Sequence, residues 1–153
     1  MYGVCLRYAQ HYDESQDLLQ EGFIKVFANL KSYRGEGDLE GWIRRIMINT
    51  AIEKYRQKLK EMTVFNDETN LNYSENNLGL EYLNLSDLLE LIQSLPMQYR
   101  LIFNLYAMEG YSHKEISEQL NITESTSRSN LARARSILQK ALVEEQKVVQ
   151  KVV

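Results

Sequence analysis

The sequence predicts an all-α protein made of two small helical domains joined by a flexible linker, the C-terminal one a helix-turn-helix. Apolar residues recur at three- and four-residue steps through most of the chain, whereas strand-like alternation is almost absent. An acidic, asparagine-rich stretch without apolar period separates two more basic blocks. We therefore expect domains at residues 1–60 and 85–153, with an acidic linker at 61–84.

The composition excludes several classes of protein. The chain has 153 residues, 44% of them hydrophobic and 25% charged, which is typical of globular proteins and not of disordered ones. Its one cysteine, Cys5, excludes an internal disulfide and a multi-cysteine zinc site. The N-terminus has no secretory signal pattern, and no apolar run approaches the roughly 18 residues of a membrane helix. We expect a cytoplasmic protein without cofactor or metal.

The formal net charge of −3 is unevenly distributed. Residues 1–60 carry +2, residues 61–93 carry −7 and residues 94–153 carry +2. Basic residues are further concentrated at 41–60 and at 121–142. Two basic helices joined by an acidic tether suggest two contacts with a polyanion such as nucleic acid. Two solvated helix faces are the alternative interpretation.

In the N-terminal block, Cys5, Leu6 and Ala9 indicate the core face of a first helix. The next helix is expected at about 14–30, with one apolar face formed by Leu19, Phe23, Val26, Phe27 and Leu30. Glycines at 35 and 37 predict a loop over 31–38. Asp38 can cap a long helix that runs to about Lys58, with apolar positions at Leu39, Trp42, Ile43, Ile46 and Tyr55.

In the C-terminal block, Ser86 can cap a short helix that ends near Ser94. Pro96 suits the first turn of the following helix, which is expected to reach Glu109. Gly110 suits the C-cap of that helix.

Two short helices follow. Ser112 and Glu115 have the spacing of a capping box, and the helix that they start would bury Ile116 and Leu120. Asn121 stands where a left-handed turn is expected, and Thr123 can cap the next helix. A helix of about eight residues followed by a three-residue turn is the spacing of a helix-turn-helix.

The last helix has the residues that a recognition helix needs. The segment 124–130 is polar throughout, so its backbone could approach a major groove closely. Arg133 and Arg135 lie further along and suit backbone phosphates. Leu131, Ile137, Leu138 and Leu142 would form its core side. A helical hairpin that only packs is the alternative.

The C-terminal block resembles the promoter-reading domain of bacterial sigma factors of the extracytoplasmic-function (ECF) group. The resemblance rests on Leu95-Pro96 with Arg100, on 110–117 and on 126–135. Ser117, Ser127, Arg128 and Asn130 depart from the usual residues of that pattern. The resemblance implies contacts with the −35 promoter element, made by Ser125, Thr126, Arg128, Ser129, Asn130, Arg133 and Arg135.

The N-terminal block resembles sigma region two. Asp17, Gln20, Glu21 and Phe23 match its D-x-x-Q-E-x-F motif, which implies that Asp17, Gln20 and Glu21 bind the β′ coiled coil of core RNA polymerase. The loop 32–38 falls where the family captures a flipped base of the −10 element. Contacts with that element would come from Tyr33, Arg34, Trp42, Arg44, Arg45, Asn49, Lys54 and Arg56. For Trp42 and Tyr33, core packing is the alternative.

The family resemblance implies a transcription initiation factor that binds core RNA polymerase through its β′ and β subunits and directs it to promoter DNA. Family members can also be held by an anti-sigma factor. Met1 falls part-way along the family's first helix, so either the start of this sequence is truncated or this helix is short. The acidic linker would cross the polymerase, as a nucleic-acid mimic or as a spacer.

Other functions remain open at this point. A stand-alone helix-turn-helix regulator would bind duplex DNA as a homodimer without polymerase, and a helical adaptor would have no affinity for DNA. No enzyme is expected, because the chain has no Walker loop and no nucleophile-base set.

Overall fold

The structure is a computed structural model that describes residues 1–65 and 85–152, with side chains for 1–62 and 85–143. The chain divides into two compact units, Met1–Asp67 and Glu68–Val153. In the described residues all regular structure is helical, which confirms the all-α prediction. None of the described helices is both long and apolar enough to cross a membrane. Most of the expected linker, residues 66–84, lies outside the described residues.

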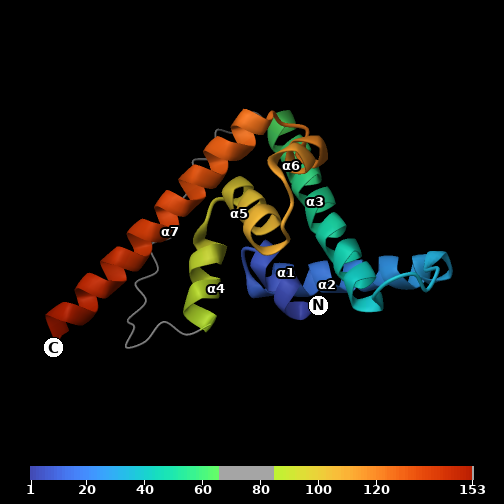
Figure 1. The fold of residues 1–153 in the computed structure, drawn as a ribbon, viewed down its shortest axis with the longest axis horizontal. Helices are drawn as coiled ribbons and strands as arrows, with labels where there is room; N and C mark the ends of the chain where they lie inside the picture. Colours follow the sequence, from blue (N-terminus) through green and yellow to red (C-terminus); the bar gives the residue numbers. More distant parts are fainter. Residues whose placement is uncertain (66–84, 153) are drawn as a thin grey trace. The chain divides into compact units, whose positions relative to one another are not determined.

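The N-terminal unit contains α1 (Tyr2–Tyr8), α2 (Tyr12–Asn29), a single 3₁₀ turn η1 (Leu30–Ser32) and α3 (Leu39–Phe65). Helix α1 packs against both α2 and α3, and α2 crosses α3 (Figure 1). The core of this unit consists of side chains from all three helices: Val4, Cys5, Tyr8, Ala9, Leu18, Val26, Met47, Ile48, Ala51, Ile52 and Tyr55. Helix α3 extends to Phe65, several residues beyond the end that the apolar pattern predicts.

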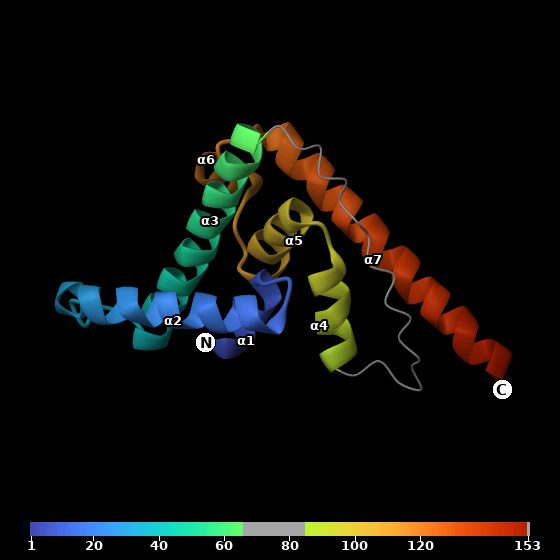
Figure 2. The same cartoon turned by 180° about the vertical axis from the view of Figure 1, so that it is seen from behind.

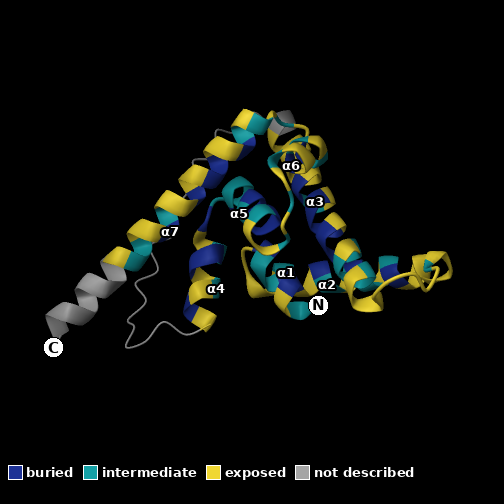
Figure 3. Cartoon of the chain, in the orientation of Figure 1, coloured by how far each residue is buried: buried dark blue, intermediate teal, exposed yellow. Residues whose placement is uncertain are grey.

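The buried face of α2 differs from the expected one. The residues that point inward are Ser15, Leu18, Gly22 and Val26, at steps of three and four. Phe27 and Leu30, which the sequence pattern assigns to the apolar face, are 71% and 50% exposed. In Figure 3, the C-terminal end of α2 carries exposed residues. The expectation was wrong for Phe27 and Leu30, because α3 approaches on the side of Gly22, whereas Val26 is buried as expected and Leu19 and Phe23 are half-buried.

Gly22 explains which side faces the core. A Cβ atom at this position would collide with the Sδ atom of Met47 on α3. The Met47 side chain is almost completely buried, so it would have to repack within the core to make room. The missing side chain therefore lets the two helices approach closely, and α2 turns its glycine side toward α3.

Helix α3 begins as predicted. The backbone N–H of Gly41 donates to Oδ2 of Asp38 at 2.9 Å, which satisfies one of the unpaired N–H groups of the first turn. The preceding loop turns sharply at Gly35 and Gly37, whose φ angles are 72° and 86°. These left-handed conformations favour glycine, so the two glycines fix the course of the loop.

The C-terminal unit contains α4 (Leu85–Ser94), α5 (Met97–Phe103), a π-helical segment η2 (Asn104–Met108), α6 (His113–Leu120) and α7 (Glu124–Val152). Helices α5 and α6 both pack on α7, and Figure 2 shows α5 beside α7 from behind. Leu91, Leu95, Ala134 and Leu138 form a core cluster, covered by Tyr99, Phe103, Ile137, Ala141 and Leu142.

The start and end signals around α4 and α5 are partly as expected. Helix α4 begins at Leu85, so Ser86 lies within its first turn and is not the residue before it. Pro96 occupies the N-cap position of α5, and Gly110 adopts a φ of 76° after η2. The expected single helix to Glu109 is divided into α5 and the π-helical turn η2, which the sequence analysis does not predict.

Arg100 has a structural role inside this unit. Its side chain is only 2% exposed, and Nη1 donates to the carbonyl oxygens of Gln93 and Leu95 at 2.7 and 3.0 Å. These carbonyls lie at and just after the end of α4, where helix carbonyls lack partners within the helix. Arg100, which follows Leu95-Pro96 in the family resemblance, thus connects α4 to α5.

Candidate nucleic-acid and protein interfaces

The helix-turn-helix forms as the sequence predicts. Oγ of Ser112 accepts from the N–H of Glu115 at 3.2 Å, and the Glu115 carboxylate accepts from the N–H of Ser112 at 2.8 Å. Asn121 adopts a left-handed conformation, with φ 53° and ψ 47°. The N–H of Thr126 donates to Oγ1 of Thr123 at 3.1 Å. The capping box, the turn and the second cap are confirmed, and α7 therefore begins at a fixed point.

Helix α7 presents a polar face to solvent. Among the residues that the sequence assigns to the −35 contact, those on the exposed side are Ser125, Arg128, Ser129, Arg133 and Arg135, with Thr126 half-buried. Asn130 is only 5% exposed, beside the fully buried Ser127. Asn130 therefore faces the interior of the unit, because α7 packs that side against its neighbours.

The arginines of α7 each have a neighbour within the unit. Nη2 of Arg128 lies 2.8 Å from Oε2 of Glu124. Nη1 of Arg133 donates to the hydroxyl of Tyr99 at 3.3 Å. The guanidinium carbon of Arg135 lies 5.7 Å from the ring centroid of Tyr106, in cation–π geometry. These contacts orient the guanidinium groups without burying them.

His113 joins the first helix of the motif to the second, a role that the sequence analysis does not assign. Its ring stacks on Tyr106 with a centroid distance of 4.5 Å, and Nδ1 lies 2.9 Å from Oγ of Ser127. Burial lowers the pKa of His113, and Arg128 and Arg135 lower it further, while Glu124 opposes them. The neutral ring is therefore favoured where it packs between the helices.

On the N-terminal unit, α2 has an exposed stripe that contains two of the predicted polymerase contacts. Asp17 and Gln20 are exposed. Ile24 and Phe27 continue the same side of the helix at steps of four and three, and are 61% and 71% exposed. Sequence reasoning missed these two side chains, although their spacing from Asp17 and Gln20 places all four on one face.

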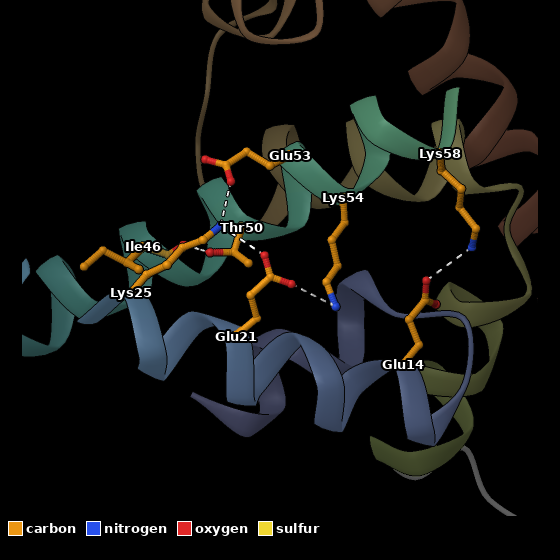
Figure 4. Close-up of polar contacts among 8 residues, drawn as sticks. All are labelled: Glu14, Glu21, Lys25, Ile46, Thr50, Glu53, Lys54 and Lys58. Atoms are coloured by element: carbon orange, nitrogen blue, oxygen red, sulfur yellow. Dashed lines mark hydrogen bonds and ion pairs between the residues drawn. The ribbon is translucent and has the colours of Figure 1, made fainter. Parts of the chain in front are cut away.

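Glu21, the third predicted polymerase contact, is engaged within the unit. Its carboxylate lies 3.1 Å from Nζ of Lys25 and 3.3 Å from Nζ of Lys54 on α3 (Figure 4). Burial alone would raise the pKa of Glu21, but the hydrogen bonds from Lys25 and Lys54 lower it below its usual value. Glu21 therefore helps to hold α2 against α3.

Two further ion pairs extend this contact along both helices. Nζ of Lys25 lies 2.6 Å from Oε2 of Glu53, and Nζ of Lys58 lies 3.3 Å from Oε1 of Glu14. The row of pairs runs beside the buried Thr50, whose hydroxyl donates to the carbonyl of Ile46 at 2.8 Å (Figure 4). Lysines that the basic composition of α3 suggests for DNA thus face the acidic side of α2.

The loop before α3 brings two aromatic rings together. The ring centroids of Tyr33 and Trp42 are 5.3 Å apart, with their planes at 45°. The hydroxyl of Tyr33 donates to the carbonyl oxygen of Gly37 at 2.9 Å, which fixes the ring across the loop. Arg34 beside it is exposed. Both rings are half-buried, so they serve the packing of the loop and still present a surface.

The other predicted −10 residues lie on α3. Arg45, Asn49 and Arg56 are exposed, at three, seven and fourteen residues from Trp42, so they follow one side of the helix. Arg44 is half-buried. Lys54 lies on a different side, toward α2. The described residues contain no group of three or more His, Cys, Asp or Glu side chains that could hold a metal ion.

Comparisons with known proteins match both units. Residues 1–61 match the family description "Sigma-70 region 2", and residues 85–138 match "Sigma-70, region 4". The chain is 34% identical over 131 residues to RNA polymerase sigma factor SigZ of Bacillus subtilis, which covers 82% of this chain and 71% of the relative. It is 30% identical over 149 residues to the ECF RNA polymerase sigma-E factor of Haemophilus influenzae, covering 90% of this chain and 78% of the relative.

A solved structure shares the fold. It is the sigma factor RpoE of Bartonella quintana, determined in complex with the anti-sigma factor NepR, and it matches with a TM-score of 0.57 at 20% identity. The match covers 92% of this chain and 88% of that chain.

Proposed function

The chain belongs to the extracytoplasmic-function (ECF) group of bacterial RNA polymerase sigma factors, and from this premise we propose which of its surfaces makes each contact. Sigma factors are non-enzymatic transcription initiation factors. This chain accordingly binds core RNA polymerase and directs it to −35 and −10 promoter elements, where it assists melting. Its partners are core polymerase and promoter DNA.

The −35 element is the proposed ligand of α7. The observation that carries this assignment is its exposed polar face, Ser125, Arg128, Ser129, Arg133 and Arg135, directly after a capped helix-turn-helix. Short serine side chains allow the helix to enter a major groove, and arginine can bind guanine through two hydrogen bonds. Thr126 lies at the edge of this face, whereas the buried Asn130 would support it from within.

The −10 element is the proposed ligand of the loop and the outer side of α3. Melting takes bases out of the stack, which costs a few kcal/mol per base, and aromatic rings can offset this cost by stacking. Tyr33 and Trp42 would supply that surface. The DNA strand backbone would be bound by Arg34, Arg44, Arg45, Asn49 and Arg56. Lys54 could bind it only by breaking its ion pair with Glu21.

Core polymerase is the proposed ligand of the exposed stripe on α2, where the β′ coiled coil would bind Asp17 and Gln20. Ile24 and Phe27 extend this stripe with apolar surface. Glu21 would contribute from its edge, while its pairs with Lys25 and Lys54 hold α2 on α3. The β subunit is proposed to bind the C-terminal unit.

The two sigma regions also define the proposed domain boundaries. We propose a region-two domain over 1–60, a linker over 61–84 and a region-four domain over 85–153. The chain would act in the cytoplasm, where bacterial polymerase and promoters are found. Regulation by an anti-sigma factor is proposed because the Bartonella sigma factor with the same fold was determined in complex with one.

The proposal is tested by run-off transcription with purified sigma-free core polymerase and a promoter library. We expect defined start sites only when the chain and core are both present, and weak DNA binding by the chain alone. Absence of any start site with both components intact would contradict the proposal. Tight, specific binding of a homodimer without core would instead favour the stand-alone regulator, which the family matches do not favour.

A further inference from the structure

Glu124 stands at the beginning of the proposed recognition helix. It is the first residue of α7, one turn before Arg128. Its Oε2 lies 2.8 Å from Nη2 of Arg128, and the two side chains are 42% and 62% exposed. A carboxylate therefore lies on the surface that would face the negatively charged DNA.

The ion pair between Glu124 and Arg128 adds little to the stability of the helix. Exposed ion pairs four residues apart contribute little to stability. The N-terminus of α7 is already capped by Thr123, whose Oγ1 accepts from the N–H of Thr126. In a DNA complex, the charge of Glu124 would also oppose phosphate binding. A role in the contact itself would offset this repulsion.

The ion pair with Glu124 can orient the guanidinium group of Arg128 toward a base. A guanidinium group has five N–H donors, and the pair with Glu124 uses Nη2. The remaining donors are left for a base edge, and a guanidinium that is already held loses less freedom when it binds. Arginine binds O6 and N7 of guanine through two such donors.

The carboxylate also has a preference of its own. When ionised it accepts hydrogen bonds and donates none. In the major groove, cytosine and adenine present amino groups, whereas guanine O6 and thymine O4 are acceptors. Glu124 would therefore favour a base with an amino group beside the guanine that Arg128 binds, and disfavour the others.

We propose that Glu124 is a specificity-determining residue of the −35 contact: it holds the Arg128 guanidinium on a guanine and selects an amino-bearing base beside it. This inference rests on the proposed function, in which α7 reads the −35 element. Glu124 is not among the −35 contacts that the family resemblance implies.

The test is run-off transcription with core polymerase on a library randomised at the −35 element. Glu124→Gln keeps the size of the side chain and removes its charge. We expect its base preference at one or two adjacent positions to fall about 5- to 10-fold. Glu90→Gln makes the same charge change at an exposed position of α4 and should leave the preference unchanged. A uniform change across all −35 sequences with Glu124→Gln, or no change, would overturn the inference.

Arg128→Ala separates this inference from the proposed function. If Arg128→Ala lowers selectivity, and adding Glu124→Gln causes no further loss at the guanine position but lowers the preference for an amino-bearing base beside it, the inference is supported. If Arg128→Ala lowers selectivity and Glu124→Gln does not, only the role of Glu124 is rejected. If Arg128→Ala leaves selectivity intact, the −35 role of Arg128 fails, and the inference fails with it.

Discussion

The two units position their functional side chains in different ways. In the C-terminal unit, hydrogen bonds between residues three or four apart set the recognition helix, as at Ser112–Glu115, Thr123–Thr126 and Glu124–Arg128. In the N-terminal unit, ion pairs between residues 28 and 44 positions apart, Lys25–Glu53 and Glu14–Lys58, decide which charges face α2 or α3. Local chemistry therefore defines one proposed interface, and helix packing defines the other.

The largest effect is expected at the exposed stripe on α2, the proposed contact with core polymerase. Asp17→Arg with Glu21→Arg should abolish binding to core polymerase, because two acidic groups become cationic at the proposed contact. Co-elution with core on a sizing column measures this, with Glu90→Arg as a charge-reversal control. Co-elution of the double variant would contradict the assignment.

The single variants separate core binding from the stability of the N-terminal unit. Asp17 is exposed, so Asp17→Arg should lose core binding without a change in thermal stability. Glu21→Arg should also lower thermal stability, because it places a cation beside Lys25 and Lys54. Equal stability of the two variants would show that the Glu21 pairs do not support the fold.

Arg100→Ala tests the packing of the C-terminal unit. It removes a buried side chain and leaves the carbonyls of Gln93 and Leu95 without this donor. We expect the unit to lose roughly 2–4 kcal/mol of stability. Urea unfolding followed in this unit measures the loss, and Lys140→Ala on the exposed side of α7 is the control. A loss as small as that of the control would contradict the structural role of Arg100.

Gly22→Ala tests the packing of the N-terminal unit. The added methyl group would collide with Met47, at an overpacking cost of about 1–3 kcal/mol that the helix propensity of alanine reduces by up to about 1 kcal/mol. Gly3→Ala in α1 is a matched control, because a Cβ there meets no atom within 4 Å. It should be neutral or stabilising. Equal thermal stability of the two variants would show that the contact between Gly22 and Met47 can adjust to a methyl group without loss of stability.

The smallest effect is expected from pH. The lowered pKa of His113 means that the unfolded chain takes up a proton more readily, so the C-terminal unit loses stability as pH falls below 6.5. The lowered pKa of Glu21 stabilises the N-terminal unit above pH 4.5, and this contribution is lost as pH falls through the folded value. Hydrogen exchange between pH 6.5 and 4.5 should therefore show earlier loosening in α6 and α7 than in α2 and α3.

His113→Asn is the control for this order of events, since it removes the titrating ring. The early loosening of α6 and α7 should then disappear. Simultaneous loss of protection in both units of the unaltered chain would contradict the assignment to His113.

The difference between local hydrogen bonds and helix packing also explains which features could be predicted from the sequence. The capping box, the left-handed Asn121 and the cap at Thr123 depend on neighbours within one turn, so residue type and spacing were sufficient. The cap of α3 by Asp38 was predictable for the same reason. The exposed face of α7 followed from its run of polar residues, with the exceptions of Ser127 and Asn130, which are buried.

The remaining features depend on tertiary packing. The inward face of α2 is set by Gly22 and Met47, which are far apart in sequence, so the spacing of large apolar residues alone wrongly placed Phe27 and Leu30 on the buried side. The same packing exposes Phe27 and engages Glu21 and Lys54 with each other. The π-helical turn at Asn104–Met108 has no signal in the local apolar pattern.

Site-specific photocrosslinking in the holoenzyme on promoter DNA tests the central claim most directly. A benzoylphenylalanine at position 32, next to Tyr33 in the loop before α3, should crosslink to the −10 element. One at position 129, on α7, should crosslink to the −35 element. Both patterns should require core polymerase. Crosslinks from both positions to a single element, or the same pattern without core, would contradict the account.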